Sequence, residues 1–495
     1  MTEKIEIQHY NEVYVRVKAD MSILQELTEF FMFRPAGFQF TPKFKAKIWD
    51  GYIRLISPHK PIIYKGLIGH LKKFCEDRDY EIVIEDGLFP TEEVPDDYGF
   101  DFAKEINATL EPRDYQNQYF VTALREGRTL SLSPTSSGKS FIIHLIVQYY
   151  WRVMGLRTLI IVPTTGLVDQ MVGDFKSYGA DPDMLYKIRG GIDKETDLPV
   201  VVSTWQSLYK MPSEYFDRFG VVIGDEAHLF SAKSLVGILE KMEHARFRFG
   251  FTGTISSESK THQLVLQGLF GPLVRYVKTK DLIESGTVAD FKVKAIVLKY
   301  PQSIVDGFKA GLSKVKKEKR YHTEREFLVS NTRRNTFIRN LVWSLKDQNN
   351  LILFDLVEKH GKVLKELFET EGRILHFMTG ASSVEERESV RHTVEDDPLK
   401  RHDILASYQL FSTGVNIKRL DNVIFASGSQ SEIRVLQSIG RTLRKGNGSD
   451  NATLYDIGDD LSKGSYTNYT MKHMEKRLEI YASEGFPFKI FKVDL

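Results

Sequence analysis

Two successive series of short β-branched apolar runs, separated by amphipathic stretches, constrain the fold of this chain most strongly. Buried parallel strands have this pattern when helices connect them. The first series comprises Thr129–Ser133, Thr158–Val162, Val200–Ser203, Val221–Gly224 and Phe247–Thr252. The second comprises Leu351–Phe354, Ile374–Met378, Asp403–Ser407, Asn422–Ala426 and Ala452–Tyr455. The pattern predicts two tandem α/β domains of related architecture, joined around Lys280–Pro301.

The segment that precedes the first series has segregated charge. Between Arg34 and Lys73, nine Lys or Arg residues stand against the single acid Asp50. The stretch Glu76–Glu105 then holds twelve acids against two bases. This inversion, with two prolines in its acidic half, indicates a domain boundary near residue 100. Because the two stretches offset each other, the formal net charge of the chain is only +2 and does not by itself indicate a polyanion partner.

A length of 495 residues suits two or three domains. We expect a small basic α+β domain with an acidic connector in residues 1–100, which binds nucleic acid, and α/β domains in residues 101–285 and 286–495. A single cysteine excludes an intramolecular disulfide and a zinc site built from cysteines. No apolar run is long enough to span a membrane, and the N-terminus is too polar for a signal peptide. We therefore expect a soluble, cytoplasmic protein with no membrane contact.

The first apolar run leads into Pro134-Thr-Ser-Ser-Gly-Lys-Ser140, which the apolar stretch Phe141–Met154 follows at once. A loop between a strand and a helix binds phosphates through its backbone N–H groups, while Lys139 brings a cation and Ser140 a hydroxyl for Mg²⁺. Ser133 stands where the full phosphate-loop pattern has its first glycine. The alternative, a serine-rich turn that happens to contain Gly-Lys-Ser, is weakened by the strand and helix on either side.

Two adjacent carboxylates and a histidine follow the run Val221–Gly224, in the order Asp225-Glu-Ala-His228. At the carboxyl end of a parallel strand, Asp225 is suited to hold magnesium, and Glu226 to accept a proton from the attacking water. The alternative is an exposed turn that caps the next helix. A phosphate loop in the same domain favours the catalytic interpretation.

Taken together, these residues resemble the superfamily 2 helicases and translocases, with Pro134–Ser140 as motif I and Asp225–His228 as motif II, a DEAH box. The resemblance covers most of residues 110–457. Six shorter matches complete it: Arg113–Gln116 (Q motif), Val162–Gln170 (motif Ia), Ser203–Ser207 (a strand-binding motif), Thr252–Thr254 (motif III), Phe411–Asn416 (motif V) and Gln437–Arg444 (motif VI). It implies two tandem RecA-like domains, each a parallel sheet with flanking helices, that hydrolyse ATP with Mg²⁺.

The resemblance also implies roles for individual residues. The catalytic residues would be Lys139, Asp225, Glu226, Gln437, Arg441 and Arg444. The nucleotide would contact Arg113, Tyr115, Gln116, Thr135, Ser136, Ser137, Gly138, Lys139, Ser140 and Gly414, with Ser140 and Asp225 as metal ligands. Coupling between the nucleotide and nucleic-acid sites would fall to His228, Thr252 and Thr254. The nucleic-acid backbone would contact Thr164, Thr165, Thr204, Trp205, Thr379, Gly380 and Thr413.

The chemistry of phosphoryl transfer explains why arginines are needed in motif VI. Phosphoryl transfer spreads negative charge over the γ-phosphate oxygens, and a facing arginine stabilises that charge. Arg441 and Arg444, three residues apart, share one face if this segment is helical. Two such arginines alone are more often a solvated helix face. Their position late in the second α/β domain favours arginine fingers.

The basic segment Phe38–Arg54 interleaves five aromatic residues with Lys43, Lys45, Lys47 and Arg54. On a β-ribbon this alternation would put apolar side chains on one face and cations on the other. We assign the aromatic residues to packing and the four cations to phosphate binding. A second basic run, Lys314–Arg320, is expected to be a solvated helix face, with a nucleic-acid contact as the alternative.

The order of a small basic domain, the Q motif and a two-lobe motor without a large insertion resembles the recombination helicases of T-even phages. That resemblance implies unwinding and branch migration of Holliday junctions, D-loops, R-loops and stalled forks. The implied partners are branched or forked DNA, RNA–DNA hybrids and phage recombination or single-strand-binding proteins, for a monomer in the host cytoplasm. Three alternatives stay open: an RNA-directed helicase, a double-strand translocase of a restriction system, and an ATP-gated sensor of duplex ends that recruits partners without unwinding.

Overall fold

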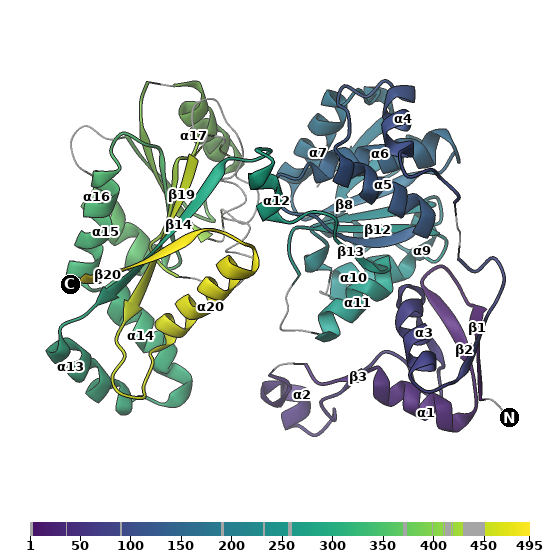
Figure 1. Cartoon of the computed structure of the whole chain (residues 1–495), viewed down its shortest axis with the longest axis horizontal. Coiled ribbons are helices and arrows are strands. Elements are labelled where there is room, and N and C mark those ends of the chain that lie inside the picture. Colours follow the sequence, from purple (N-terminus) through teal and green to yellow (C-terminus); the bar gives the residue numbers. More distant parts are fainter. Residues whose placement is uncertain are drawn as a thin grey trace. The chain divides into compact units, whose positions relative to one another are not determined.

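The computed structural model of the chain divides into two compact units, and each is described by itself (Figure 1). Met1–Ser133 and Gly138–Tyr276 make up the first unit, while Pro134–Ser137 and Val277–Leu495 make up the second. The described residues are 3–35, 37–89, 92–189, 193–230, 233–255, 260–369, 374–397, 399–408, 410, 417, 419–428 and 451–495. The predicted domain limits at 100 and 285 stay a prediction.

The N-terminal part of the first unit is a four-stranded mixed sheet with two helices. The strand order is β5 (Ile62–Tyr64), β2 (Tyr14–Lys18), β1 (Lys4–His9), β6 (Glu81–Ile84). The helices are α1 (Met21–Phe30) and α3 (Ile68–Glu76). Strand β1 alternates buried and accessible residues, so that its apolar side chains face one core. This part is the predicted small α+β domain.

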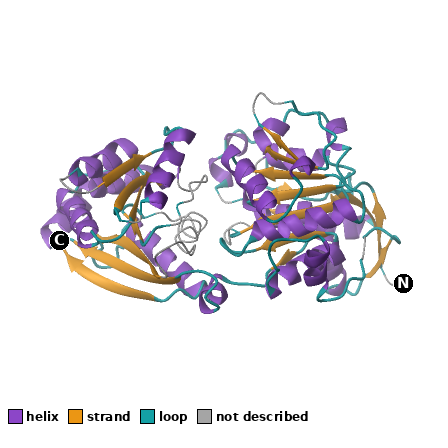
Figure 2. Ribbon diagram, turned by 90° about the horizontal axis from the view of Figure 1, so that it is seen from above, coloured by secondary structure: helices purple, strands orange, loops and turns teal. Residues whose placement is uncertain are grey.

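A seven-stranded parallel sheet forms the rest of the first unit. Its order is β13 (Leu273–Val274), β7 (Arg128–Leu132), β12 (Phe247–Thr252), β11 (Val221–Asp225), β8 (Thr158–Val162), β10 (Val200–Thr204), β9 (Leu185–Ile188). The longer helices that accompany it are α4 (Tyr98–Glu105), α5 (Asp114–Glu126), α6 (Lys139–Arg152), α7 (Thr165–Ser177), α10 (Lys233–Lys241) and α11 (Lys260–Phe270). Figure 2 shows the strands between layers of helices, which explains why all five predicted apolar runs fall in strands buried on both faces.

The second unit contains another seven-stranded parallel sheet. Its order is β16 (Ile374–Met378), β17 (His402–Ser407), β15 (Asn350–Phe354), β18 (Asn422–Phe425), β19 (Asn451–Asp460), β14 (Asp290–Lys299), β20 (Phe488–Asp494). Its described α-helices are α12 (Thr279–Glu284), α13 (Gln302–Ser313), α14 (Arg320–Val329), α15 (Thr332–Ser344), α16 (Lys362–Phe368), α17 (Val384–Asp396) and α20 (Tyr469–Ser483). The fold class of two tandem RecA-like domains is confirmed.

The segment Lys280–Pro301 is more than the predicted junction. Strand β14 occupies ten of its residues and lies inside the second sheet, between β19 and β20. Its first half alternates Phe291 and Val293 with exposed polar residues. An alternating strand lacks the continuous apolar run by which the other strands were recognised.

The basic segment Phe38–Arg54 is not a β-ribbon, and this prediction was wrong. It contains a 3₁₀ turn (Phe38–Phe40), the short helix α2 (Pro42–Lys45) and only a two-residue strand, β4 (Ile53–Arg54), paired with β3 (Met32–Phe33). Gly51 has φ +85°, and a Cβ there would meet Phe38 at 2.6 Å. The chain therefore turns too tightly for two extended strands.

The N-terminal domain shares one hydrophobic core with the first seven-stranded sheet. The contact includes a buried ion cluster in which Glu12 Oε2 lies 2.7 Å from Lys65 Nζ and 3.0 Å from Arg128 Nη2. Nearby, the hydroxyls of Tyr14 and Tyr64 both donate to Glu240, at 2.6 and 2.7 Å. These contacts join the small domain to α10 and to β7, the strand that leads into the phosphate loop.

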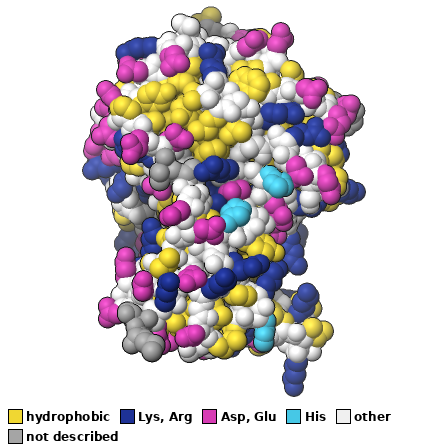
Figure 3. Space-filling view, turned by 90° about the vertical axis from the view of Figure 1, so that its right-hand side faces the viewer, with side chains coloured by type: hydrophobic (Ala, Val, Ile, Leu, Met, Phe, Trp, Pro, Cys, Tyr) yellow, Lys and Arg dark blue, Asp and Glu magenta, His cyan; other side chains and the backbone are white. Residues whose placement is uncertain are grey.

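On the face of the first unit that Figure 3 presents, the described residues form no single large patch of one charge. In Figure 3, Lys and Arg side chains are interspersed with Asp and Glu side chains over that face. This mixture agrees with a net charge near zero. None of the described helices combines the length and the apolar character needed to cross a membrane.

Candidate active site

The carboxyl ends of parallel strands gather the predicted site residues of the first unit at one edge of the sheet. The loop after β7 leads to Lys139 at the start of α6, the turn after β8 contains Thr164, and β10 ends at Thr204. Strand β11 ends at Asp225, and β12 ends at Thr252. Because β7, β12, β11, β8 and β10 are consecutive neighbours, these residues line one continuous edge, where α/β folds bind their ligands.

The loop Pro134–Gly138 has the backbone geometry of a phosphate cradle. Gly138 has φ +80°, and a Cβ on it would lie 2.4 Å from Gln116 Nε2, so only glycine fits. Ser136 is also left-handed, with φ +68°. The Ser137 hydroxyl donates to Pro134 O at 2.6 Å and closes the turn. Successive N–H groups of such a turn, followed by a helix N-terminus, form an anion site.

Lys139 and Ser140, the first two residues of α6, each have a hydrogen-bond partner within the first unit. Lys139 Nζ donates to Ser133 O at 3.3 Å, and Ser133 N in turn donates to Thr252 O at 2.9 Å. The hydroxyls of Ser140 and Tyr178 are 2.9 Å apart. Tyr178, just beyond α7, was not predicted, because no local motif marks it and only the fold brings it to the loop.

The two carboxylates of motif II differ in environment. Asp225 is 8% exposed, and burial, together with the charge of Glu226, raises its pKa to about 6, although the charge of Lys139 acts in the opposite direction. Glu226 is accessible by comparison and has a left-handed φ of +53°, which costs energy for a residue other than glycine. A buried carboxylate held beside a second one is a fitting ligand for a divalent cation.

His228, Thr252 and Thr254 lie together, while their coupling role stays a prediction. The Thr252 hydroxyl donates to Thr254 O at 2.8 Å, so its oxygen accepts from His228 Nδ1, 2.9 Å away. The same Nδ1 lies 3.3 Å from Glu226 Oε2. A chain of polar contacts thus runs from the carboxylate of motif II to the end of β12.

The Q-motif residues surround the start of α5. Gln116 is 4% exposed, and its carbonyl oxygen accepts from Arg113 N at 2.9 Å. Its amide nitrogen lies against Gly138, as the close approach above shows. Arg113 Nη1 donates to the Tyr115 hydroxyl at 3.0 Å. Contact with adenine stays a prediction, whereas the contact between the Q motif and the phosphate loop is a feature of the structure.

The predicted nucleic-acid contacts of the first unit lie at the starts of two helices. The Thr164 hydroxyl accepts from Leu167 N at 3.4 Å as the N-cap of α7, and Thr165 is exposed beside it. Thr204, 4% exposed, lies 3.2 Å from the Ser207 hydroxyl, and Trp205 is half-buried. Neighbouring pairs at one sheet edge can follow a single backbone.

In the second unit, Thr379 and Gly380 follow β16, where the Thr379 hydroxyl accepts from Ala381 N at 3.3 Å. The remaining predicted residues of this unit lie outside the described residues. They are Thr413, Gly414, Gln437, Arg441 and Arg444.

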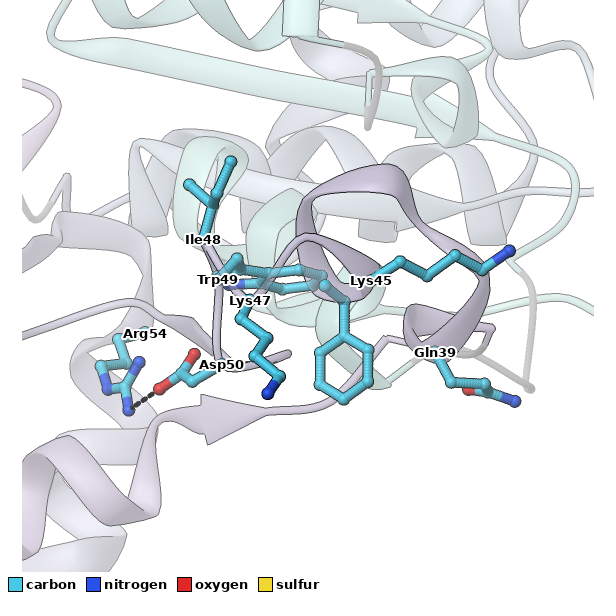
Figure 4. A pocket seen from close by; sticks show the side chains of 8 residues that line it. Gln39, Lys45, Lys47, Ile48, Trp49, Asp50 and Arg54 are labelled. Carbon is cyan, nitrogen blue, oxygen red and sulfur yellow. Dashed lines mark hydrogen bonds and ion pairs between the residues drawn. The ribbon is translucent and has the colours of Figure 1, made fainter.

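The cations of the basic segment are all exposed: Lys43, Lys45, Lys47 and Arg54. Arg54 donates to Asp50 at 2.6 Å, and three of these cations border an open hollow (Figure 4). The lining residues are Gln39, Phe44, Lys45, Lys47, Ile48, Trp49, Asp50 and Arg54. The aromatic residues pack mainly on one another and on cations: Phe38 packs edge-on against Phe44, with Arg34 over its ring. Phe40 is 68% exposed and Ile48 78%.

Three protein-family models match successive parts of the chain. "DNA helicase UvsW, N-terminal" matches residues 4–85, "Type III restriction enzyme, res subunit" residues 109–257, and "Helicase conserved C-terminal domain" residues 333–446. The ATP-dependent DNA helicase uvsW of Enterobacteria phage T4 is 34% identical, over 99% of this chain and 100% of its own length. The chain belongs to the UvsW helicase family.

The solved structures agree with membership of the UvsW family. The crystal structure of T4 UvsW is similar at a TM-score of 0.51 and 31% identity, over 99% of both chains. A fragment of a putative HsdR subunit of a type I restriction enzyme from Vibrio vulnificus, at a TM-score of 0.55 and 19% identity, covers 90% of this chain and 76% of its own, and shows the fold alone. The protein is thus a homologue of the ATP-dependent DNA helicases of superfamily 2, which implies ATP use and DNA binding.

Proposed function

We propose that the protein is an ATP-driven DNA helicase and translocase that unwinds and branch-migrates branched DNA in phage recombination, repair and replication. The observation that carries the proposal is the sheet edge of the first unit, where Lys139, at the end of the phosphate loop, and the adjacent carboxylates of Asp225 (buried) and Glu226 (half-buried) are found at the carboxyl ends of parallel strands of one sheet. The choice of DNA as the nucleic acid rests on the similarity to the DNA helicase UvsW. Holliday junctions, D-loops, R-loops and stalled forks are the proposed substrates.

Each residue at that edge has a proposed role in ATP hydrolysis. The N–H groups of Thr135–Gly138 bind the phosphates, and Lys139 neutralises charge on the β- and γ-phosphate oxygens. Glu226 accepts a proton from the attacking water. In the second unit, Gln437, Arg441 and Arg444 of motif VI are proposed to complete the catalytic set, with the arginines stabilising charge on the γ-phosphate, and Gly414 is proposed to contact the nucleotide.

The donor set also fits Mg²⁺. Ser140 and Asp225 would hold the ion, because a hydroxyl at the start of α6 and a buried carboxylate are hard oxygen ligands. When bound, Mg²⁺ neutralises negative charge on the phosphate oxygens of ATP. Burial raises the pKa of Asp225, and a cation bound there would stabilise its ionised form.

The DNA backbone would follow Thr164, Thr165, Thr204 and Trp205 on the first unit, and Thr379, Gly380 and Thr413 on the second. His228, Thr252 and Thr254 would couple this path to hydrolysis, since their polar contacts begin at Glu226. Lys43, Lys45, Lys47 and Arg54 would bind phosphates of a branch. We further propose that the protein acts on RNA–DNA hybrids and has single-strand-binding or recombination proteins as partners. It would be a monomer in the host cytoplasm.

The experiment compares forked, four-way and linear DNA, and the matching RNA, as activators of ATP hydrolysis and as substrates for unwinding. We expect forked and four-way DNA to give the strongest stimulation and to be unwound. Equal stimulation by linear duplex and junction would refute the preference for branched DNA. If RNA but not DNA stimulates ATP hydrolysis, the protein is an RNA-directed helicase instead.

A further inference from the structure

The corner between α13 and α14 in the second unit concentrates positive charge. Over the seven residues Lys314–Arg320 it holds five cations and the single acid Glu318. The four lysines at 314, 316, 317 and 319 are exposed, and Arg320 is half-buried. The segment is not the predicted face of one helix, because α13 ends at Ser313, a 3₁₀ turn covers Lys317–Lys319, and α14 begins at Arg320.

In their ion pairing, these four lysines differ from four other lysines of the same unit. Within the described part of the chain, no ion pair involves any of the four. By contrast, four lysines elsewhere in the unit each have a carboxylate partner: Lys359 with Glu326, Lys362 with Glu358, Lys365 with Glu369 and Lys400 with Asp397. The corner therefore presents a net positive field that its own surface does not neutralise.

The corner also places cations where a helix disfavours them. The N-terminus of a helix carries a partial positive charge and attracts acids. Helix α14 has no acid in its first turn, and its N-cap residue, Lys319, makes no side-chain capping bond. The positive end of the α14 dipole and the lysines add to the same potential, which favours an anionic ligand.

The surroundings add to this potential and hold the corner in shape. Arg320 Nε donates to Val315 O at 3.0 Å and closes the turn. The nearby acid Asp306 already pairs with Lys463, at 2.6 Å. Lys309, also exposed, lies on α13 in the same region, with Nζ 5.5 Å from the centre of the Tyr466 ring. Figure 1 shows α13 and α14 at one end of the unit.

We propose that this corner, Lys314–Arg320 with the N-terminus of α14, binds backbone phosphates of a DNA duplex arm. Several exposed cations that form no ion pair with a described residue, close to a helix N-terminus, suit the repeated phosphates of a polyanion. The inference rests on the proposed function, because branched DNA offers more than one arm to a single molecule. A second anchoring surface raises the affinity for a branched substrate above that for an isolated strand.

The test uses the full chain with Lys314, Lys316, Lys317 and Lys319 all replaced by glutamine. A matched control replaces Lys359, Lys362, Lys365 and Lys400 by glutamine, which removes the same total charge from paired lysines. Binding to a synthetic four-way DNA junction is measured without ATP by fluorescence anisotropy over a range of salt concentrations. Thermal unfolding of both variants checks that the fold is retained.

We expect the first variant to bind the junction at least about tenfold more weakly than the control at low salt. Its slope of log affinity against log salt should be smaller by about 0.9 for each lysine that contacts a phosphate. If the unaltered protein binds the junction and the two variants show equal affinity and equal slope, the proposal that this corner binds DNA is overturned. Failure of the unaltered protein to bind any DNA would instead overturn the proposed function.

Discussion

Replacing Glu12 by glutamine should destabilise the whole first unit. Its carboxylate is the shared partner of two cations whose side chains are only 1% exposed (Lys65) and 3% exposed (Arg128). Burial lowers the pKa of Lys65 to about 8 and that of Arg128 to about 10. Burial alone would raise the pKa of Glu12, but the hydrogen bond from Lys65 and the two positive charges bring it below its usual value. Glu12, Lys65 and Arg128 are therefore stable as buried charges only because each is paired with a group of opposite charge.

The magnitude follows from what the substitution leaves behind. Glu12→Gln keeps the shape of the side chain but leaves two cations buried without a counter-charge. Removing one partner of a buried ion pair costs about 3–5 kcal/mol. In a domain of this size each kcal/mol lowers the melting temperature by about 2–4 °C, so the expected fall is about 6–20 °C. Because Arg128 is the first residue of β7, the loss should extend from the small domain into the motor lobe.

The assay is thermal unfolding by circular dichroism together with urea denaturation of the full chain. Glu6→Gln is the matched control, since Glu6 pairs with Lys4 on the surface, with both side chains at least 40% exposed, and its loss should not shift the midpoint measurably. The double variant Glu12→Gln with Lys65→Met should recover part of the loss, because it removes one stranded charge. A midpoint for Glu12→Gln that equals that of Glu6→Gln would refute the reasoning.

Three further predictions concern the site itself. Gly138→Ala should weaken binding of a non-hydrolysable ATP analogue, measured by calorimetry, because its Cβ would collide with Gln116 in a left-handed backbone; unchanged binding would contradict the cradle. Glu226→Gln should slow ATP hydrolysis by about 10²–10⁴-fold while nucleotide binding persists, and steady-state hydrolysis near the unaltered rate would exclude Glu226 as the base. His144→Phe should improve acid stability. Burial lowers the pKa of His144 to about 4, so between about pH 6.5 and 4 the unfolded chain binds a proton that the folded chain does not. Lowering the pH from 6.5 to 5 should therefore decrease the free energy of unfolding by about 2 kcal/mol. An equal fall in the urea midpoint of the phenylalanine variant would contradict this account.

The sequence predicted what depends on local pattern. Buried strands such as β8 and β11 are continuous apolar runs, and the phosphate loop and the acidic pair follow such runs directly, so motif and fold supported each other. Strand β14 was missed because its first half alternates. The turns of Phe38–Arg54 were missed because the alternation of aromatic residues and cations resembles a β-ribbon, whereas Gly51 and the left-handed Lys47, with φ +57°, bend the chain.

Contacts between residues far apart in the chain also could not be predicted from the sequence. Glu12 meets Lys65 across 53 positions and Arg128 across 116, and no periodicity links residues so far apart. The same holds for Tyr178 beside Ser140. Such pairs depend on how the small domain and α7 pack onto the sheet, which pattern alone does not specify.

The most direct test of the central claim is strand displacement from a forked DNA by the full chain with ATP, compared with the Lys139→Ala variant. The account predicts that the unaltered protein separates the strands only with ATP. The variant should still bind the fork but neither hydrolyse ATP nor separate the strands, because Lys139 is the cation at the phosphate cradle. Displacement by the variant at the unaltered rate, or displacement without ATP, would contradict an ATP-driven DNA motor.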